Sequence, residues 1–311
     1  MKLSQALEEF EFIVENGPIG TRLKYDYGYN ASYDLSRDQK GREILIELYK
    51  GDLDVAHSSA VPIVLNAATF RASRNHLVAY GINAFEQIRE INISNLLLID
   101  EIKKEINSDI PIVLGAPLGS MYDAYSIENI PSVNEAFDYH KEQISVFKEM
   151  PVDFINVVTL PTITEALGIA LACGESGLEY TIGFILAGNG KLLDGTSLTD
   201  AIEIIDSKTK NKPIGYLVTC THSSVIKILE SNVKNLDRLI GVQANGSSLS
   251  PSELAQLNKP LSDDPEQFSM EIKSLKDHFQ LKILGGCCGT TREHLEHIVK
   301  TCQVQSSFSV S

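Results

Sequence analysis

The chain has 311 residues, of which 43% are hydrophobic and 22% charged, a composition typical of a globular protein and not of a disordered one. Its 27 Lys and Arg against 41 Asp and Glu give a net charge of −14. This charge argues against nucleic acid or an anionic membrane as a partner, because phosphate groups are bound by clustered positive charge. No segment approaches the roughly 18 apolar residues of a membrane span. The first ten residues are not typical of a secretory signal, so we expect a cytoplasmic protein.

Short runs rich in Val, Ile and Leu recur along the chain, each followed by a polar loop and a helical pattern. Several runs are apolar on both faces, as buried parallel strands are. The eight runs are Phe12–Glu15, Val61–Ala67, Ile110–Pro117, Asp153–Leu160, Glu179–Leu186, Pro213–Cys220, Arg238–Ala244 and Leu281–Cys288. The segments Asn134–Met150 and Thr290–Thr301 carry apolar residues near a 3.6-residue period, which predicts helices. Thr290 and Glu293 have the spacing of a capping box.

Eight alternating strand–helix units predict a closed (β/α)₈ barrel of the TIM type. We assign residues 1–311 to one domain, with a core of about residues 10–303, because no linker divides the chain. A doubly wound open sheet is the competing fold, but the Gly-x-Gly-x-x-Gly pattern that often follows its first strand is missing. The active site of a barrel lies at the carboxyl ends of its strands, which limits the search for functional residues.

Three of the five cysteines stand at predicted strand ends: Cys220, Cys287 and Cys288. The odd number of cysteines argues against a disulfide framework. Glycines on both sides of the adjacent pair permit a sharp bend of the backbone. This bend would let both sulfurs face one ion. Three thiolates favour a soft or borderline metal, and an open fourth position is typical of catalytic zinc. We therefore predict a Zn²⁺ site. Cys173 and Cys302 fall on helical stretches and are interpreted as core residues.

Other interpretations of these cysteines remain open. Free cysteine is among the most buried residue types and often only fills a core. The adjacent pair Cys287 and Cys288 could form a redox disulfide. His222 lies two residues after Cys220 and could complete a structural site of three cysteines and one histidine, or stand at the start of the next helix.

The segment Ile-Leu-Gly-Gly-Cys-Cys-Gly-Thr-Thr-Arg-Glu-His at 283–294 resembles the Gly-Gly-Cys-Cys-Gly-Thr-Thr signature of the homocysteine S-methyltransferase family. Cys220 matches the upstream zinc cysteine of that family. Weaker resemblances lie at Gly17–Thr21, Asn66–Ala72, Asp194–Thr196 and Gln243–Gly246.

The resemblance implies a single-domain, zinc-dependent S-methyltransferase of methionine biosynthesis. It would transfer a methyl group from a sulfonium donor, S-methylmethionine or S-adenosylmethionine, to the thiolate of homocysteine. Its partners would be this small thiol acceptor and the donor. The catalytic and zinc-binding residues would be Cys220, Cys287 and Cys288. Residues expected to bind substrate are Asn16, Gly17, Asn66, Val158, Thr159 and Asn245.

The sequence departs from the family pattern where the acceptor would bind. Asn16 stands where the family usually has Asp, Val158 where it has an acidic residue, and Thr219 where it has Asn. The two carboxylates would be expected to hold the ammonium group of homocysteine. Either Glu15 takes the role of the missing carboxylate, or the enzyme methylates a different thiol or selenol. A non-catalytic zinc-binding relative is a further alternative.

Tyrosines gather in two of the predicted loops, and their aromatic faces could hold a cationic donor or simply pack the loops. They are Tyr25, Tyr27, Tyr29 and Tyr33 after the first strand, and Tyr122 and Tyr125 after the third. The segment Ser247–Ser269 lacks clear periodicity, and long loops of this kind often cover an active site.

Overall fold

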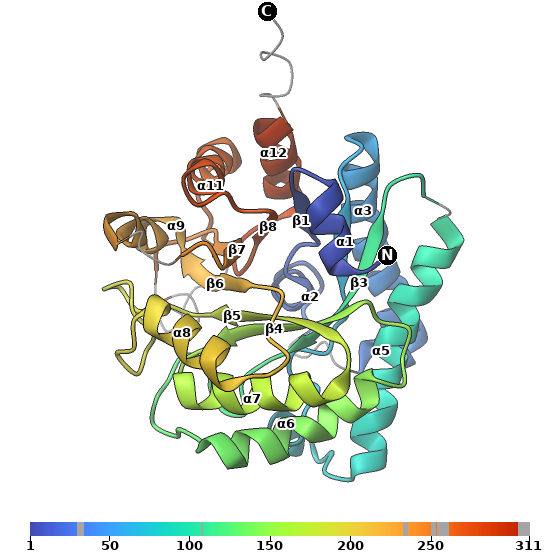
Figure 1. Ribbon diagram of the computed structural model, residues 1–311. Helices are drawn as coiled ribbons and strands as arrows, with labels where there is room; N and C mark the ends of the chain where they lie inside the picture. The colour runs from blue at the N-terminus through green and yellow to red at the C-terminus, as the bar shows by residue number, and fades with distance from the viewer. Residues whose placement is uncertain (30–33, 107, 233–235, 250–252, 254–260, 304–311) are drawn as a thin grey trace, which may run out of the picture.

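The computed structural model describes residues 1–29, 34–106, 108–232, 236–249, 253 and 261–303. Eight parallel strands form a closed barrel in chain order, and β8 pairs with β1 to complete it (Figure 1). The strands are β1 (Ile13–Glu15), β2 (Ile63–Asn66), β3 (Ile112–Leu118), β4 (Phe154–Leu160), β5 (Glu179–Phe184), β6 (Tyr216–His222), β7 (Leu239–Asn245) and β8 (Ile283–Gly286). The predicted (β/α)₈ barrel is therefore confirmed.

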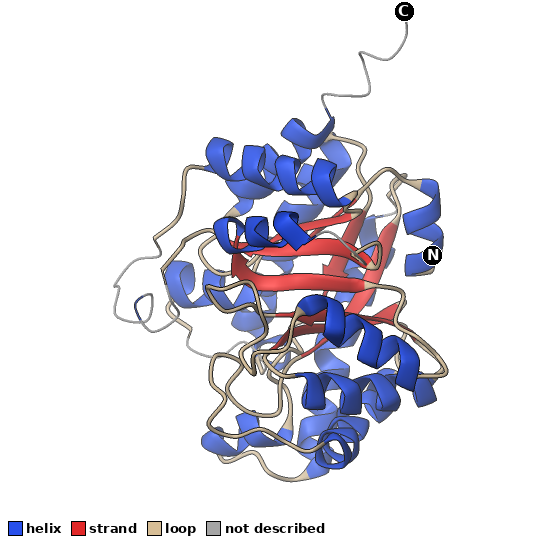
Figure 2. Cartoon of the chain, turned by 60° about the vertical axis from the view of Figure 1, so that its left-hand side comes forward, coloured by secondary structure: helices blue, strands red, loops and turns tan. Residues whose placement is uncertain are grey.

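Helices surround the sheet on its outer face (Figure 2). The α-helices of the described residues are α1 (Leu3–Glu9), α2 (Ile19–Tyr27), α3 (Gln39–Ser58), α4 (Arg74–Leu77), α5 (Phe85–Ile106), α6 (Val133–Phe147), α7 (Ile163–Ser176), α8 (Leu198–Lys208), α9 (Ser223–Ile226), α11 (Pro265–Phe279) and α12 (Arg292–Gln303). Short 3₁₀ helices are η1 (Leu35–Arg37), η2 (Val78–Tyr80) and η3 (Lys227–Asn232).

The eighth strand ends two residues earlier than predicted, and this moves the adjacent cysteines into a turn. The backbone N–H of Thr290 donates to the Cys287 carbonyl at 3.1 Å, which closes a β-turn. Gly289, the third residue of that turn, has φ 86°, a conformation that glycine adopts without strain. The bend that the glycines permit is thus present directly after β8.

The predicted capping box of the last helix is wrong. The Thr290 hydroxyl donates to the Cys287 carbonyl at 2.8 Å and so belongs to the turn. The helix α12 begins at Arg292, and Thr291 stands before it. Both the N–H and the hydroxyl of Thr291 lie within hydrogen-bond distance of His294 Nδ1, at 3.1 and 2.9 Å. His294 therefore makes the capping-box contact that we assigned to Glu293.

The helix α1 closes the amino end of the barrel. Leu3 and Ala6 are fully buried and form one cluster with apolar side chains from the first residues of six strands. Those side chains are Ile13, Val64, Val113, Phe154, Leu217 and Ile283. The apolar plug fills the amino end of the barrel, which leaves the carboxyl end for polar and sulfur-bearing groups.

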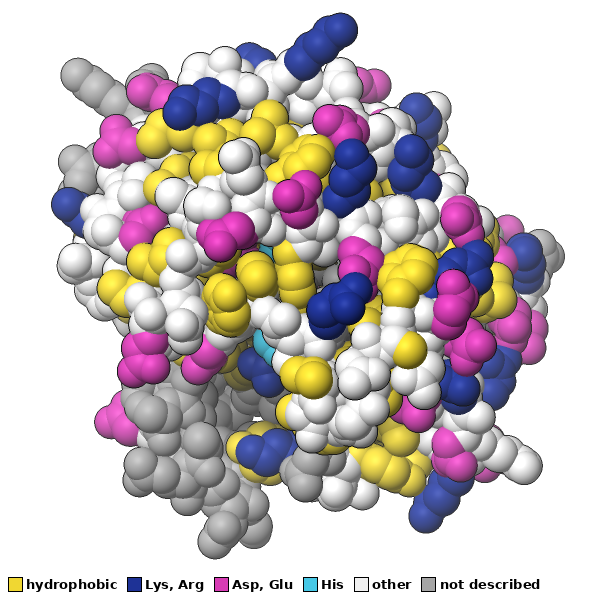
Figure 3. All heavy atoms as spheres, turned by 90° about the horizontal axis from the view of Figure 1, so that it is seen from below, with side chains coloured by type: hydrophobic (Ala, Val, Ile, Leu, Met, Phe, Trp, Pro, Cys, Tyr) yellow, Lys and Arg dark blue, Asp and Glu magenta, His cyan; other side chains and the backbone are white. Residues whose placement is uncertain are grey.

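The surface carries both signs of charge. On the described part of the face below α6 and α7, basic side chains stand among acidic ones and form no separate patch (Figure 3). None of the helices within the described ranges has the length and hydropathy needed to cross a membrane.

Candidate metal and substrate site

Three cysteine sulfurs meet at the carboxyl end of the barrel. The Sγ atoms of Cys220, Cys287 and Cys288 all lie within 4.8 Å of one another. Cys220 lies near the end of β6 and is 8% exposed, whereas the other two follow β8 and are half-buried. The predicted convergence of the three residues is confirmed. Cys173 and Cys302 are buried in α7 and α12, as expected of core residues, and burial raises the pKa of both thiols.

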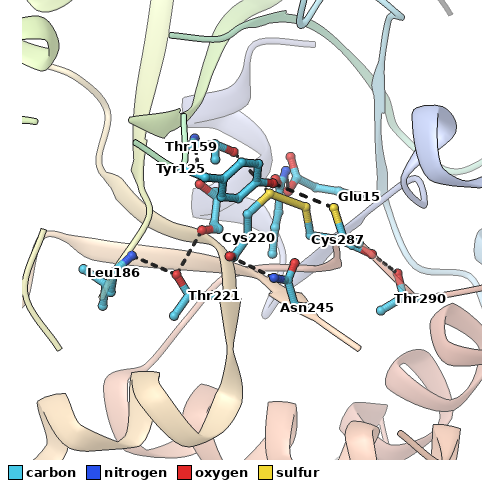
Figure 4. The surroundings of a disulfide bond; sticks show 12 residues. Glu15, Tyr125, Thr159, Leu186, Cys220, Thr221, Asn245, Cys287 and Thr290 are labelled. Carbon is cyan, nitrogen blue, oxygen red and sulfur yellow. Dashed lines mark hydrogen bonds between the residues drawn. A yellow bond between two sulfur atoms is a disulfide. The ribbon is translucent and has the colours of Figure 1, made fainter. Parts of the chain in front are cut away.

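The structure joins Cys220 and Cys287 as a disulfide, with Cα atoms 5.5 Å apart (Figure 4). This separation is within the range that disulfides require. Cys288 is a free thiol, so the alternative of a disulfide between the adjacent Cys287 and Cys288 is not what the structure shows. The Cys287 N–H donates to the Ala244 carbonyl at 2.7 Å and so ties Cys287 to β7. No other disulfide joins cysteines of the described residues.

His222 does not join the sulfur cluster. Its Nε2 lies 2.7 Å from Asp263 Oδ2, and its Nδ1 accepts the N–H of Ser224 at 3.3 Å as the N-cap of α9. Of the two positions proposed for His222, the start of the next helix is confirmed.

Cys220 is held in an unusual backbone conformation. Its φ is 49° and that of Thr159 on β4 is 62°, both in the left-handed region that residues other than glycine rarely adopt. The registers of β4 and β6 shift at these points, as at β-bulges, which re-aim side chains next to active sites. The Thr159 hydroxyl donates to Cys220 Sγ at 3.2 Å, and its N–H donates to Thr219 Oγ1 at 2.8 Å. Thr159 thus supports the sulfur, and Thr219 fixes Thr159.

A buried carboxylate lies inside the barrel on β1, the strand that pairs with β8. Glu15 is 1% exposed and accepts hydrogen bonds from Asn66 Nδ2 at 3.1 Å, Asn156 Nδ2 at 2.9 Å and Gln243 Nε2. Burial raises the pKa of Glu15, and the three amide donors oppose that shift. Asn156 also accepts from Thr181 at 3.0 Å. We define Glu15, Asn66, Asn156, Thr181 and Gln243 as the amide layer.

The sequence prediction missed Asn156 and Thr181. Each is a buried polar residue inside a mainly apolar strand. That pattern was the available signal, because a polar side chain in a buried strand must find hydrogen-bond partners inside the fold.

The predicted substrate residues of β1 and β2 bond mainly to one another. Asn16 Oδ1 accepts the Asn66 N–H at 2.7 Å, and its Nδ2 donates to the Gly17 carbonyl at 3.2 Å. The Gly17 N–H donates in turn to Asp52 Oδ2 at 3.0 Å, and Asp52 pairs with Arg22 at 2.7 Å. Asp52, on α3, was not predicted, because it lies 35 residues from the turn that it holds.

The remaining two candidates lie nearer to the sulfurs. Asn245 donates through Nδ2 to the Cys220 carbonyl at 2.9 Å (Figure 4). Its Oδ1 is buried and has no hydrogen-bond partner among the described residues. Val158 is 8% exposed and brings no charge to the site. The structure therefore offers one free acceptor atom beside Cys220.

The tyrosines divide between packing and the site. Tyr27 and Tyr29 pack against the main core, and Lys24 lies 4.9 Å from the Tyr25 ring centroid. Tyr125 places its hydroxyl 3.9 Å from Cys288 Sγ, and burial is the main cause that raises the pKa of this phenol.

Two predictions fall wholly or partly on residues that the structure does not describe. Tyr33 lies outside the described residues, as do residues 250–252 and 254–260 of the predicted covering segment Ser247–Ser269. The last five residues of that segment form the first turn of α11, so that part is helical.

A family model described as homocysteine S-methyltransferase matches residues 17–302. The chain belongs to this family. It is therefore an S-methyltransferase, and family membership supports methyl transfer to homocysteine. The chain is 21% identical to homocysteine S-methyltransferase YbgG of Bacillus subtilis over 318 residues, covering 95% of this chain and 96% of the relative.

Solved structures of the homocysteine methyltransferase MmuM from Escherichia coli share the fold at 15% identity. The metallated form has a TM-score of 0.72 and covers 95% of this chain and 98% of its own. The oxidized form has a TM-score of 0.76 and covers 94% and 96%.

Proposed function

We propose that the enzyme transfers a methyl group from a sulfonium donor to the thiolate of homocysteine, giving methionine, and that it depends on zinc. The observation that carries this proposal is the cluster of three cysteine sulfurs within 4.8 Å of one another at the carboxyl end of the barrel. In a barrel enzyme this end is where catalytic groups lie.

The residues present fit a zinc ion. Cys220, Cys287 and Cys288 in their reduced state offer three thiolates, and the group contains no further His, Asp or Glu from the described residues. Thiolates select a soft or borderline metal, and three protein ligands leave a position for substrate. When bound, the metal would lower the pKa of the acceptor thiol and hold its sulfur as a nucleophile. MmuM, which shares the fold, has also been solved in a metallated form.

The residues of the chain then position the reactants. In the reaction a sulfur–carbon bond forms at the acceptor thiolate while a carbon–sulfur bond of the sulfonium breaks. The electron pair of the broken bond stays with the donor sulfur, which leaves as a neutral thioether. Thr159 donates to Cys220 Sγ and so stabilises its thiolate form. Alignment of the two sulfurs with the methyl carbon between them would supply much of the rate.

We assign recognition of the acceptor to the groups around the mouth of the barrel. Asn245 Oδ1, a buried acceptor without a partner, would receive the ammonium group. Val158 would contact the aliphatic part of the acceptor, and Thr159 would hold Cys220 in place. Asn16, Gly17 and Asn66 would shape the wall at the ends of β1 and β2, and Asn66 would keep Glu15 fixed.

One observation favours a second acceptor class, a thiol or selenol without an ammonium group. The side chain of Asn16 is bonded at both ends, Val158 is uncharged, and the carboxylate of Glu15 already accepts three amide donors. No free carboxylate of the described residues thus faces the sulfurs at these positions.

Calorimetric titration of the reduced, zinc-loaded protein decides between the two acceptors. L-homocysteine should bind at one site per chain with release of a proton, and Cys287→Ser should abolish this binding. The matched probe is 4-mercaptobutanoate, which is homocysteine without its amino group, and we expect it to bind at least about 10-fold more weakly. Asn245→Ala should remove that difference. Equal or tighter binding of 4-mercaptobutanoate by the wild type would overturn the homocysteine assignment in favour of the second class.

A further inference from the structure

One arginine differs from the others because it forms no ion pair with a described residue. Of the eight arginines, seven form ion pairs with carboxylates of the described residues. Arg71, in the loop after β2, has none among these residues, and its guanidinium lies 5.7 Å from the ring centroid of its neighbour Phe70. An exposed and unpaired guanidinium at the carboxyl end of a barrel strand is available to bind an anionic group.

Arg71 lines a cavity of about 370 Å³ between the loops that follow β2 and β3. Asn75, His76, Tyr122 and Asp123 line it as well. The two loops are tied together, because Asn75 Nδ2 donates to the Met121 carbonyl at 3.1 Å and His76 Nε2 lies 2.9 Å from the Ser120 carbonyl. The cavity is therefore held in shape before a ligand arrives.

The cavity wall carries one charge of each sign. Asp123, like Arg71, forms no ion pair with a described residue, although its Oδ1 accepts the Tyr125 N–H. Burial lowers the pKa of His76, so this residue adds no second positive charge at neutral pH. A guanidinium and a carboxylate that line one cavity complement a zwitterion that has its own carboxylate and ammonium groups.

Tyr125 connects this cavity to the sulfurs. Its backbone N–H donates to Asp123 Oδ1 at 3.0 Å, and its hydroxyl lies 3.9 Å from Cys288 Sγ. Figure 4 shows the ring of Tyr125 beside Cys220 and Cys287. A sulfonium is attracted to aromatic faces; Tyr122 lines the cavity, and Tyr125 lies beside the sulfurs.

We propose that the cavity binds the amino-acid end of the methyl donor, with Arg71 on its carboxylate and Asp123 on its ammonium group. The sulfonium then lies toward Tyr125 and Cys288. This inference rests on the proposed function and narrows its donor to a zwitterionic amino-acid sulfonium. Arg71 and Asp123 are specificity-determining residues, because they contact the part of the donor that does not react.

Three sulfonium compounds that differ in their charged groups test the roles of Arg71 and Asp123 separately. S-methyl-L-methionine has both the carboxylate and the ammonium, dimethylsulfoniopropionate has only the carboxylate, and trimethylsulfonium has neither. Calorimetry without acceptor should show that Arg71→Met weakens binding of the first two compounds about 10- to 100-fold and leaves the third unchanged. Asp123→Asn should weaken only S-methyl-L-methionine. Arg74→Met is the matched control, since Arg74 pairs with Glu142 and does not line the cavity.

Steady-state kinetics with homocysteine then shows which substrate the cavity serves. Arg71→Met should raise KM for the amino-acid donor by a similar factor and leave KM for homocysteine unchanged. The inference is overturned if the wild type does not bind S-methyl-L-methionine, if Arg71→Met weakens all three compounds equally, or if only the KM of homocysteine rises. Donor binding that depends on Arg71 in a protein without turnover would contradict the proposed function and leave the cavity assignment standing.

Discussion

Two groups of polar side chains at the carboxyl end of the barrel differ in what they bond. At the end of β6 and after β8, three sulfurs converge and two of them are half-buried. Inside the barrel, the amide layer takes one residue from each of β1, β2, β4, β5 and β7, and its side chains bond one another around Glu15. The sulfur cluster is arranged to bind something from outside, whereas the amide layer is already satisfied. We infer that reaction chemistry belongs to the sulfur cluster and that the amide layer keeps the barrel interior rigid.

Replacement of a sulfur should have the largest effect. Cys287→Ser should lower zinc affinity by more than about 100-fold, because loss of a ligand exceeds the 10- to 100-fold typical of residues that support ligands. Chelator competition under reducing conditions measures this affinity. Cys302→Ser, a buried thiol of α12, should bind zinc like the wild type. Equal affinities for the two variants would show that the metal does not bind at the cluster.

Crowding the amide layer should reduce stability but not metal binding. A β-carbon at Gly115 would overlap Asn66 Oδ1, so Gly115→Ala should cost about 1–3 kcal/mol of unfolding free energy. Urea denaturation measures this loss. Gly20→Ala is the control, since a β-carbon there meets no atom within 4 Å and the position lies in α2. A large drop in zinc affinity in Gly115→Ala would show that the amide layer and the sulfur cluster are coupled.

Loss of the hydrogen bond that Thr159 donates to Cys220 Sγ should have a smaller effect on zinc affinity. Thr159→Val keeps the side-chain shape and loses the hydroxyl that donates to Cys220 Sγ, so zinc affinity should fall about 10-fold. Thr181→Val removes a hydroxyl from the amide layer and should leave zinc affinity unchanged. If both variants lose affinity equally, the hydrogen bond to sulfur is not the cause.

The pH dependence of stability should reveal the buried carboxyl. Burial raises the pKa of Glu15 above its ordinary value of 4.5. Its contribution to stability is therefore complete below the unfolded pKa and is lost as pH rises through the folded pKa. Between pH 4 and 9, the wild type should lose stability relative to Glu15→Gln by up to about 1.4 kcal/mol per pH unit in the range where Glu15 titrates. Urea denaturation at each pH measures both unfolding free energies. If these change with pH in the same way in the wild type and in Glu15→Gln, the prediction is contradicted.

The sequence predicted the sulfur cluster better than the amide layer. Cys287 and Cys288 carry a local signal, since the surrounding glycines permit a bend, and the barrel topology then places Cys220 only one strand away. Asp52 carries no comparable signal, because it acts on a residue distant in the chain, and the resemblance indicated Thr159 as a substrate residue without its bond to Cys220 Sγ. The left-handed backbone of Cys220 and Thr159 could not be predicted either, since residue type argues against it and only the packed barrel imposes it.

The plug formed by α1 has a consequence for the order of events during synthesis. Leu3 and Ala6 are synthesised before all eight strands, but the cluster they complete includes Ile283 of the last strand. Contacts this distant in sequence form late in folding. The barrel therefore cannot close at either end until β8 has emerged from the ribosome. Since Cys287 and Cys288 come directly after β8, the set of metal ligands is complete only then, and zinc would be acquired after the last strand has been made.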